Sequence, residues 1–178
     1  NFSRIELVHT PRASPTGMMG GMSRPVSAPL AALMAVAGSA SALPLNSPAP
    51  TFTLPDGKGQ PWNLADHLGR ERLLVVSAPS AAYLNEIADQ AGLLQDRDLR
   101  VVALTLPGDA ALKRPASPML TVLADPGGRV ATRYGRAVLI GKDRGVKASY
   151  ASLPSLSTVL GLIDTMPMRQ QERKAGGR

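Results

Sequence analysis

Side chains that commonly carry out covalent or acid–base chemistry are scarce in this sequence. Cysteine is absent, which excludes a thiol nucleophile, a disulfide and a cysteine metal site. His9 and His67 are the only histidines, and His9 lies in an N-terminal stretch that we expect to be removed. One remaining histidine argues against a histidine-rich metal site. We therefore predict no catalytic residue, no metal and no cofactor.

Two residue combinations resemble catalytic or ligand-binding motifs. Asp66 and His67, together with Ser77 or Ser80, supply the three residue types of a hydrolase triad. Neither serine lies in a G-x-S-x-G turn, so we interpret this combination as coincidence. Residues 125–128 read Asp-Pro-Gly-Gly and lack the Lys-Ser/Thr ending of a phosphate-binding loop, so we interpret them as a turn.

The apolar pattern predicts the strands that would position any site. Unbroken apolar runs are typical of strands that are covered on both faces. An alternating segment before the turn at 55–57 indicates a further, shorter strand. The predicted strands are 51–54, 73–77, 99–106, 119–123 and 137–140, with 146–150 joined to the last by a hairpin turn at 142–145.

Helical spacing of apolar residues predicts the remaining elements. A short helix should contain Trp62, Leu64 and Leu68, and a longer one should follow Pro79. Further helices are expected at 129–134 and after Ser155, with one helical turn at 110–113. Strand–helix–strand units require parallel pairing, whereas the late hairpin requires antiparallel pairing. The sequence therefore predicts an α/β fold with a mixed central sheet of four to five strands flanked by helices.

Three segments, in order, resemble peroxiredoxins and secreted thioredoxin-like proteins. They are 49–57 (APTFTLPDG), 125–135 (DPGGRVATRYG) and 136–140 (RAVLI) with Gly145. This resemblance implies a thioredoxin-like fold over about 49–150. Residues 139–147 and 163–169 also resemble an uncharacterised bacterial family of thioredoxin-like domains, a domain of unknown function.

The sequence departs from both families at the positions of their catalytic residues. Thioredoxins carry C-x-x-C at the start of the helix after the central strand, where residues 78–84 read APSAAYL. Peroxiredoxins carry a threonine or serine four residues after a strand-end proline and a cysteine seven after it. Counted from Pro79, those positions hold Tyr83 and Glu86. Arg136 falls where peroxiredoxins place the arginine that supports the thiolate.

The resemblance thus implies a vacated active site, which we take as the candidate binding region. Its residues are Pro79, Ser80, Tyr83, Glu86 and Arg136. An ion pair between Glu86 and Arg136 would fill the region, whereas an unpaired Arg136 would leave it open to a small anion. Both side chains could instead be solvated on the surface.

The N-terminal part has the pattern of an export signal. Within 22–42, a short basic start precedes an apolar stretch and an A-x-A ending, which is typical of a secretory signal peptide cleaved after Ala42. An uncleaved anchor or a buried helix is the alternative. We expect residues 1–21 to be a disordered leader or a wrongly extended start, and the domain to occupy 43–168.

The C-terminal stretch 169–178 is strongly basic. It contains four basic residues and one acidic residue, so we predict a disordered tail with weak contact to anionic surfaces. Aromatic residues make up only 3% of the sequence, which argues against stacking on nucleic-acid bases.

These observations favour a secreted, periplasmic or envelope-located domain without catalytic activity. It would act as a binding or structural module, with an envelope protein or an anionic ligand as its partner. One alternative is a component of an extracytoplasmic redox or oxidative-stress system that depends on a partner's thiols. Another is a small-anion-binding protein that uses the pocket near Arg136.

Overall fold

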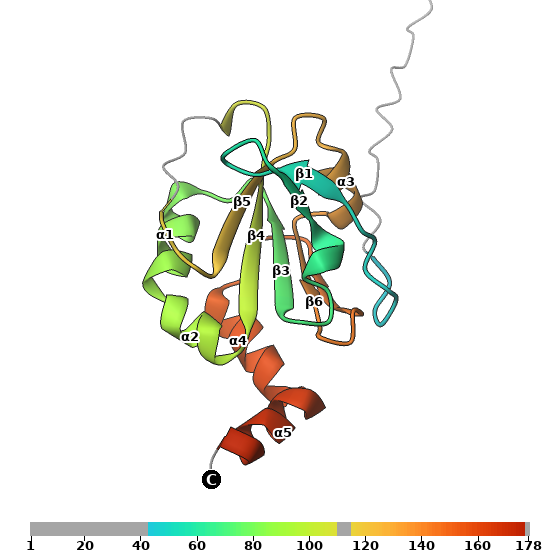
Figure 1. Ribbon diagram of the computed structural model, residues 1–178, viewed down its shortest axis with the longest axis vertical. Coiled ribbons are helices and arrows are strands. Elements are labelled where there is room, and N and C mark those ends of the chain that lie inside the picture. Colours follow the sequence, from blue (N-terminus) through green and yellow to red (C-terminus); the bar gives the residue numbers. More distant parts are fainter. Residues whose placement is uncertain (1–42, 110–114, 177–178) are drawn as a thin grey trace, which may run out of the picture. The chain divides into compact units, whose positions relative to one another are not determined.

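The central strand β3 (Arg72–Ser77) is buried along its whole length in the computed structural model (Figure 1). The structure describes residues 43–109 and 115–176, so the predicted leader, signal peptide and helical turn at 110–113 lie outside the described residues. Alternate side chains of β3 belong to two separate apolar clusters, because successive residues of a strand face opposite sides of a sheet. Both faces of β3 are therefore covered.

A mixed sheet of five strands forms around β3, in the order β5-β4-β3-β6-β7. β3 pairs in parallel with β4, which pairs in parallel with β5. On its other side β3 pairs antiparallel with β6, and β6 forms a hairpin with β7. The predicted mixed sheet is confirmed. Besides β3, the strands are β4 (Leu99–Thr105), β5 (Leu120–Ala124), β6 (Ala137–Ile140) and β7 (Val146–Tyr150).

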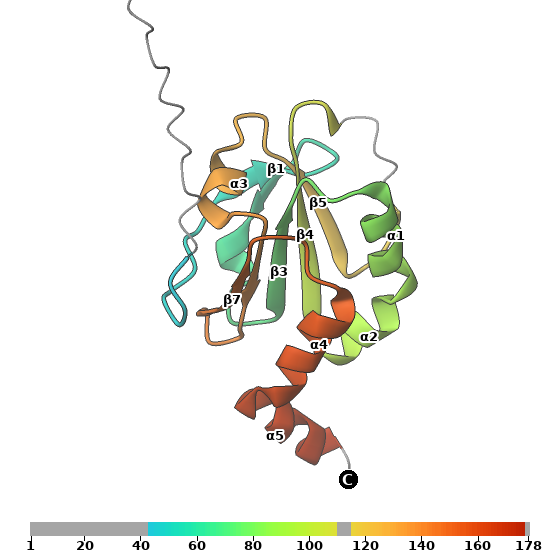
Figure 2. The same cartoon turned by 180° about the vertical axis from the view of Figure 1, so that it is seen from behind.

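Helices cover one face of this sheet, and a smaller group of elements covers the other (Figures 1 and 2). The helical face carries α1 (Ala81–Asp89), α2 (Ala91–Asp96) and α4 (Leu156–Thr165). Their buried apolar residues pack with Leu74 and Val76 of β3 in one of the two clusters. The opposite face carries the antiparallel pair β1 (Thr53–Pro55) and β2 (Pro61–Asn63), the 3-10 turn η1 (Leu64–Asp66) and α3 (Arg129–Tyr134).

Serine side chains begin the two longer covering helices. The Ser80 hydroxyl accepts a hydrogen bond from the Tyr83 amide at 3.2 Å, and Ser155 does the same for Thr158 at 3.2 Å. Each bond satisfies one of the amides that the first turn of a helix leaves unpaired. No helix within the described part of the chain has the length and apolarity needed to span a bilayer.

Two local predictions on these faces were wrong. Trp62 lies in β2 and not in a helix, and the predicted helix shrinks to the single turn η1. Trp62 is held there by aromatic packing, since its ring lies 6.1 Å from Phe52 and stacks on His67 at 4.5 Å. The helix after Pro79 is also not continuous, because Gln90 leaves helical backbone geometry between α1 and α2.

The predicted disordered tail is also wrong, because residues Pro167–Gly176 form helix α5. The domain therefore extends beyond the predicted boundary at 168. α5 is a mostly polar helix whose only buried side chain is Arg169, while Met168 is 46% exposed. Its attachment to the domain consequently depends on charge and not on an apolar face.

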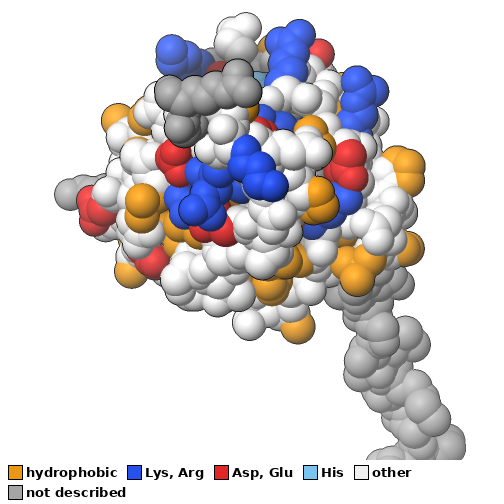
Figure 3. All heavy atoms as spheres, turned by 90° about the horizontal axis from the view of Figure 1, so that it is seen from below, with side chains coloured by type: hydrophobic (Ala, Val, Ile, Leu, Met, Phe, Trp, Pro, Cys, Tyr) orange, Lys and Arg blue, Asp and Glu red, His pale blue; other side chains and the backbone are white. Residues whose placement is uncertain are grey.

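Ion pairs connect α5 to the end of the sheet where β3 begins. Glu172 accepts from Arg72 at 3.2 Å and from Lys142 at 2.8 Å, and the Arg72 side chain is only 1% exposed. Arg169 donates to the Asp96 carboxylate at 2.5 Å. Figure 3 views the molecule from below and shows basic and acidic side chains interspersed. Of the basic residues that the structure describes in α5, Arg169 is matched by carboxylates, those of Asp96, Asp164 and Glu172.

The ion pairs of α5 lower the pKa of Glu172. Burial alone would raise the pKa of Glu172, but the hydrogen bond from Lys142 and the charge of Arg72 outweigh it and hold the pKa below its ordinary value of 4.5. A carboxyl whose pKa is lowered in the folded state stabilises that state at pH values above the ordinary pKa. That stability is lost as the pH falls through the lowered folded value.

We predict that Glu172→Gln lowers the free energy of unfolding by roughly 1–3 kcal/mol at neutral pH, because it leaves the buried Arg72 without its carboxylate. The variant should also lose less stability than the wild type on acidification below pH 4.5. Urea denaturation at several pH values measures both effects.

Gln171→Ala is the matched control for this prediction, since Gln171 is an exposed residue of the same helix. It should change the free energy of unfolding by less than about 0.5 kcal/mol. Equal stability of the two variants at every pH would contradict an electrostatic attachment of α5.

Candidate functional site

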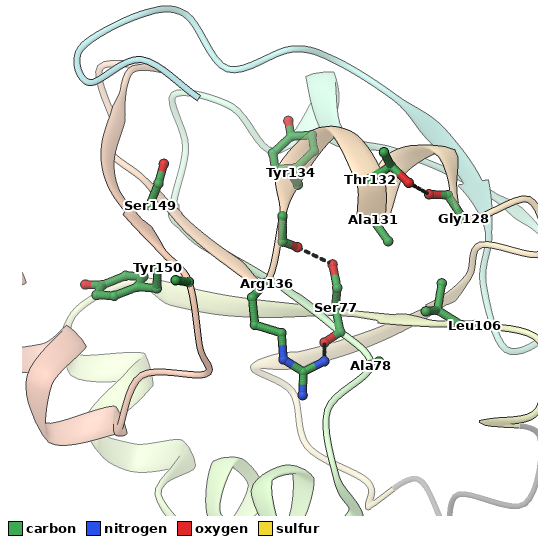
Figure 4. Close-up of a pocket in the computed structure, with 12 residues that line it drawn as sticks. Ser77, Ala78, Leu106, Gly128, Ala131, Thr132, Tyr134, Arg136, Ser149 and Tyr150 are labelled. Carbon is green, nitrogen blue, oxygen red and sulfur yellow. Dashed lines mark hydrogen bonds between the residues drawn. The ribbon is translucent and has the colours of Figure 1, made fainter. Parts of the chain in front are cut away.

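A pocket of about 620 Å³ opens where β3 ends and β6 begins (Figure 4). It lies at the opposite end of β3 from the ion pairs of α5. Segments from the ends of β3, β4 and β7, together with α3, form its walls. The lining residues are Ser77, Ala78, Leu106, Gly128, Ala131, Thr132, Tyr134, Gly135, Arg136, Ser149, Tyr150 and Ala151.

Hydrogen bonds between the last residue of β3 and the residues before β6 fix the floor of this pocket. The Ser77 amide donates to the Arg136 carbonyl at 3.0 Å, and Arg136 Nη1 donates back to the Ser77 carbonyl at 2.7 Å. The Ser77 hydroxyl donates to the Gly135 carbonyl at 2.7 Å. Figure 4 shows the two side-chain bonds. Arg136 is thereby held in one position at the pocket.

The electrostatics of the pocket are those of a single cation. Arg136 is half-buried and is the only charged residue among the described residues that line the pocket. No carboxylate within ion-pair distance of Arg136 occurs in the described part of the chain. A guanidinium has five N–H groups, and one hydrogen bond to the described residues, that to Ser77, uses them. The pocket can therefore attract one negative charge.

Most hydroxyl groups around the pocket already donate to backbone carbonyls. Ser77 donates to Gly135, and Thr132 donates to Gly128 at 2.7 Å. The Tyr134 and Ser149 hydroxyls likewise donate to backbone carbonyls, those of residues 50 and 43. Figure 4 shows the Tyr134 hydroxyl directed away from Arg136.

Tyr150 is different from the other hydroxyl residues. Its hydroxyl is buried without a hydrogen-bond partner among the described residues. Burial raises the pKa of Tyr150, because the charged phenolate would lose its hydration. The ring packs against the cluster on the helical face and points away from Arg136 in Figure 4. This hydroxyl therefore adds no donor beside Arg136.

The backbone at the pocket is strained at Ala78 and adopts a conformation typical of glycine at Gly135. Ala78 has φ 48°, in the left-handed region that favours glycine, while its amide donates to the Leu104 carbonyl at 2.9 Å. Gly135 has φ 72° and ψ −151°, a combination that only glycine adopts readily. A side chain at Gly135 would point into open space, so its glycine reflects backbone geometry and not crowding.

Of the five residues predicted for the site, only Arg136 lines the pocket. Pro79 and Ser80 begin the segment leading into α1, and the Ser80 hydroxyl is used as the helix cap. Tyr83 donates its hydroxyl to the Pro154 carbonyl at 2.9 Å. The predicted pair of Glu86 with Arg136 is not among the ion pairs of the described residues. Glu86 instead accepts from the Gln90 side chain at 3.4 Å.

Arg136 lies beside the end of β3. Its guanidinium binds the carbonyl of Ser77, two residues before Pro79 and three before the cap of α1.

Burial, followed by the charge of Glu86, raises the pKa of Tyr83 to about 12. Tyr83 is therefore neutral at physiological pH and acts here as a hydrogen-bond donor.

The residues that resembled catalytic motifs have structural partners. His67 Nδ1 lies 2.6 Å from the Glu71 carboxylate. The buried Asp125 carboxylate accepts from the Ala131 amide at 2.8 Å and so stabilises the turn into α3. Within the described residues no cluster of three or more histidine, cysteine, aspartate or glutamate side chains could hold a metal ion.

Sequence reasoning missed most of the pocket walls. Ser149, Tyr150 and Ala151 come from the end of β7, and Leu106 from the end of β4, so their approach depends on sheet order. Gly135, which follows α3, was the one local signal for a pocket wall. A glycine at a helix end indicates unusual backbone geometry.

Comparison with family models gives one match. The family model described as Domain of unknown function (DUF4174) matches residues 63–172, from the end of β2 into α5. Among curated proteins, no sequence match was found.

Solved structures show the fold. A yeast mitochondrial 1-Cys peroxiredoxin is 18% identical, with a TM-score of 0.58 over 73% of this chain and 79% of that one. Peroxidoxin BcpB from Mycobacterium tuberculosis is 18% identical, with a TM-score of 0.57 over 68% and 97%. A candidate thioredoxin from Neisseria meningitidis is 24% identical, with a TM-score of 0.52 over 66% and 87%. The fold is thioredoxin-like, as the sequence predicts.

We predict that Ala78→Gly raises the free energy of unfolding by roughly 0.5–1 kcal/mol. Relief of the left-handed strain should exceed the extra chain entropy that glycine has in the unfolded state. Ala82→Gly, at an exposed helical position of α1, should lower the free energy of unfolding by about 0.5 kcal/mol. Urea denaturation compares the two variants, and the same sign for both would show that Ala78 is not strained.

Proposed function

We propose that this chain, which belongs to the family described as Domain of unknown function (DUF4174), is a non-catalytic thioredoxin-like binding domain of the cell envelope. The observation that carries the proposal is the pocket at Arg136. It has a positioned cation and a largely apolar lining, in a chain that contains no cysteine. Such a pocket can hold a ligand, whereas thiol peroxidase and disulfide exchange both require a thiolate.

The walls of the pocket support binding over catalysis. The hydroxyls of Ser77 and Thr132 donate to backbone carbonyls, and neither makes a hydrogen bond to a histidine or carboxylate within the described residues. A serine or threonine nucleophile requires such a base nearby. A guanidinium offers N–H donors and no acceptor, so it does not serve as a general base. The role of Arg136 in this proposal is to bind a negatively charged group.

The proposed location outside the cytoplasm rests on the sequence of residues 22–42. Their basic start, apolar centre and A-x-A ending have the order of a secretory signal peptide. Cleavage after Ala42 would make Leu43 the first residue of the mature domain. The Leu43 carbonyl accepts from the Ser149 hydroxyl at 3.2 Å, so a chain that starts there keeps this contact with β7.

The pocket favours a small anion as the ligand of the proposed binding domain. The predicted competitor for Arg136 was Glu86, which bonds to Gln90 instead. Arg136 therefore retains N–H groups for a ligand. The single bond from Arg136 to the Ser77 carbonyl leaves the rest of its guanidinium available in the lining of the pocket.

We predict that N-terminal sequencing of the protein isolated from its native cells gives Leu43 as the first residue. We also predict that the protein is found in the extracytoplasmic fraction. Ala40→Leu together with Ala42→Leu should block cleavage, because signal peptidase requires small residues before the cut. A cytoplasmic protein that retains Met22 would contradict the proposed location.

We predict background rates for the purified chain in hydrogen peroxide reduction and in insulin disulfide reduction. No residue can form a sulfenic acid or a mixed disulfide. A thioredoxin and a peroxiredoxin with active-site cysteines serve as positive controls. Thiol-dependent turnover that co-purifies with the chain and disappears in Arg136→Gln would show that the pocket is catalytic.

A further inference from the structure

We propose that the pocket at Arg136 binds a monocarboxylate that carries an apolar body. This inference rests on the proposed binding function and names the ligand class of the same site. A single carboxylate would pair with the Arg136 guanidinium, and its hydrocarbon part would lie along the walls formed by Ala78, Leu106 and Ala131.

The charge of the pocket selects a ligand with one negative charge. Arg136 is the only charged residue among the described residues that line it. A guanidinium presents its N–H groups in a planar fork that matches the two oxygens of a carboxylate. A phosphate dianion would bring a second charge, for which the described lining offers no second cation.

The hydrogen-bond donors that the described walls leave free favour a ligand whose polar part is one negatively charged group. The hydroxyls of Ser77, Thr132, Tyr134 and Ser149 already donate to backbone carbonyls. These hydroxyls can still accept hydrogen bonds but no longer donate them, so Arg136 is the donor that remains for the oxygens of an anionic ligand among these side chains. One charged head and an apolar body fit the described donors.

The size and lining of the pocket suit a small amphiphilic molecule. A volume of about 620 Å³ falls within the range of small-molecule sites, about 300–1,000 Å³. Most of the lining is apolar, so burial of hydrocarbon contributes to affinity in proportion to the area removed from water. Acetate, which has the head group without the body, should therefore bind much more weakly.

Two sources could supply this chemistry, and both present a carboxylate on an apolar chain. One is a free medium-chain carboxylic acid, and the other is the C-terminus of a peptide with apolar final residues. Octanoate represents the first source, and N-acetyl-leucyl-leucine represents the second. Their neutral counterparts, octanol and the peptide amide, keep the apolar body and remove the charge.

Isothermal titration calorimetry of the full chain tests the proposal with these four probes, together with acetate and octyl phosphate. Octanoate, N-acetyl-leucyl-leucine or both should bind. Each carboxylate that binds should do so at least ten-fold more tightly than its own neutral counterpart, and also at least ten-fold more tightly than acetate and than octyl phosphate. Arg136→Gln should weaken that binding roughly 10- to 100-fold, which corresponds to the loss of a charge-assisted hydrogen bond.

Arg133→Gln is the matched control, because Arg133 is an exposed arginine of α3 that does not line the pocket. It should leave the affinity unchanged. Arg136→Lys keeps the charge but loses the fork, so it should bind with intermediate affinity. It also provides a second variant if Arg136→Gln fails to fold, which circular dichroism would reveal.

The remaining outcomes would overturn the proposal. Equal binding of octanol and octanoate would remove the role of charge, and equal binding of acetate would remove the role of the apolar body. Tighter binding of octyl phosphate would identify a different head group, and equal losses in Arg133→Gln and Arg136→Gln would indicate unspecific attraction. If no probe binds, the ligand class is wrong, while extracytoplasmic location and absence of thiol activity are tested separately.

Discussion

The antiparallel pairing of β3 with β6 is the constraint on which the candidate site depends. It brings the residue before β6, Arg136, beside Ser77 at the end of β3, where backbone and side-chain hydrogen bonds join the two residues. A parallel β6 would place its first residue at the other end of β3, beside Arg72. The hairpin with β7 then brings Ser149 and Tyr150 to the same end of the sheet. One pairing thus creates the pocket floor and one of its walls.

The two ends of β3 are stabilised in different ways. At its beginning, the buried Arg72 is matched by the carboxylate of Glu172 from α5, and further ion pairs surround it. At its end, Arg136 donates to a backbone carbonyl and lacks a carboxylate partner within the described residues. A buried charge without a counter-ion is costly, whereas a half-buried one at an open pocket stays hydrated. Only the second arginine is therefore available to a ligand.

Sequence reasoning succeeded where one local pattern determines an element. The apolar run of β3 and the helical spacing of Leu84 and Ile87 both gave correct elements, because burial alone specifies them. It failed for the tail, since the charged residues of α5 find partners such as Arg72 that are a hundred residues away. For the site, resemblance located Arg136, but the identity of its neighbours required the order of strands in the sheet. Distant pairing cannot be read from a local pattern.

The left-handed backbone at Ala78 lies beside the hydrogen bonds that fix Arg136. Left-handed geometry at Ala78 costs about 1–2 kcal/mol, and the surrounding hydrogen bonds must offset that cost. Its amide bonds to Leu104, and the neighbouring Ser77 is bonded on both its hydroxyl and its carbonyl. A backbone that such bonds did not hold could relax into an ordinary turn. The same bonds hold the Arg136 guanidinium in the lining of the pocket, and the proposed binding of an anion would depend on this fixed position.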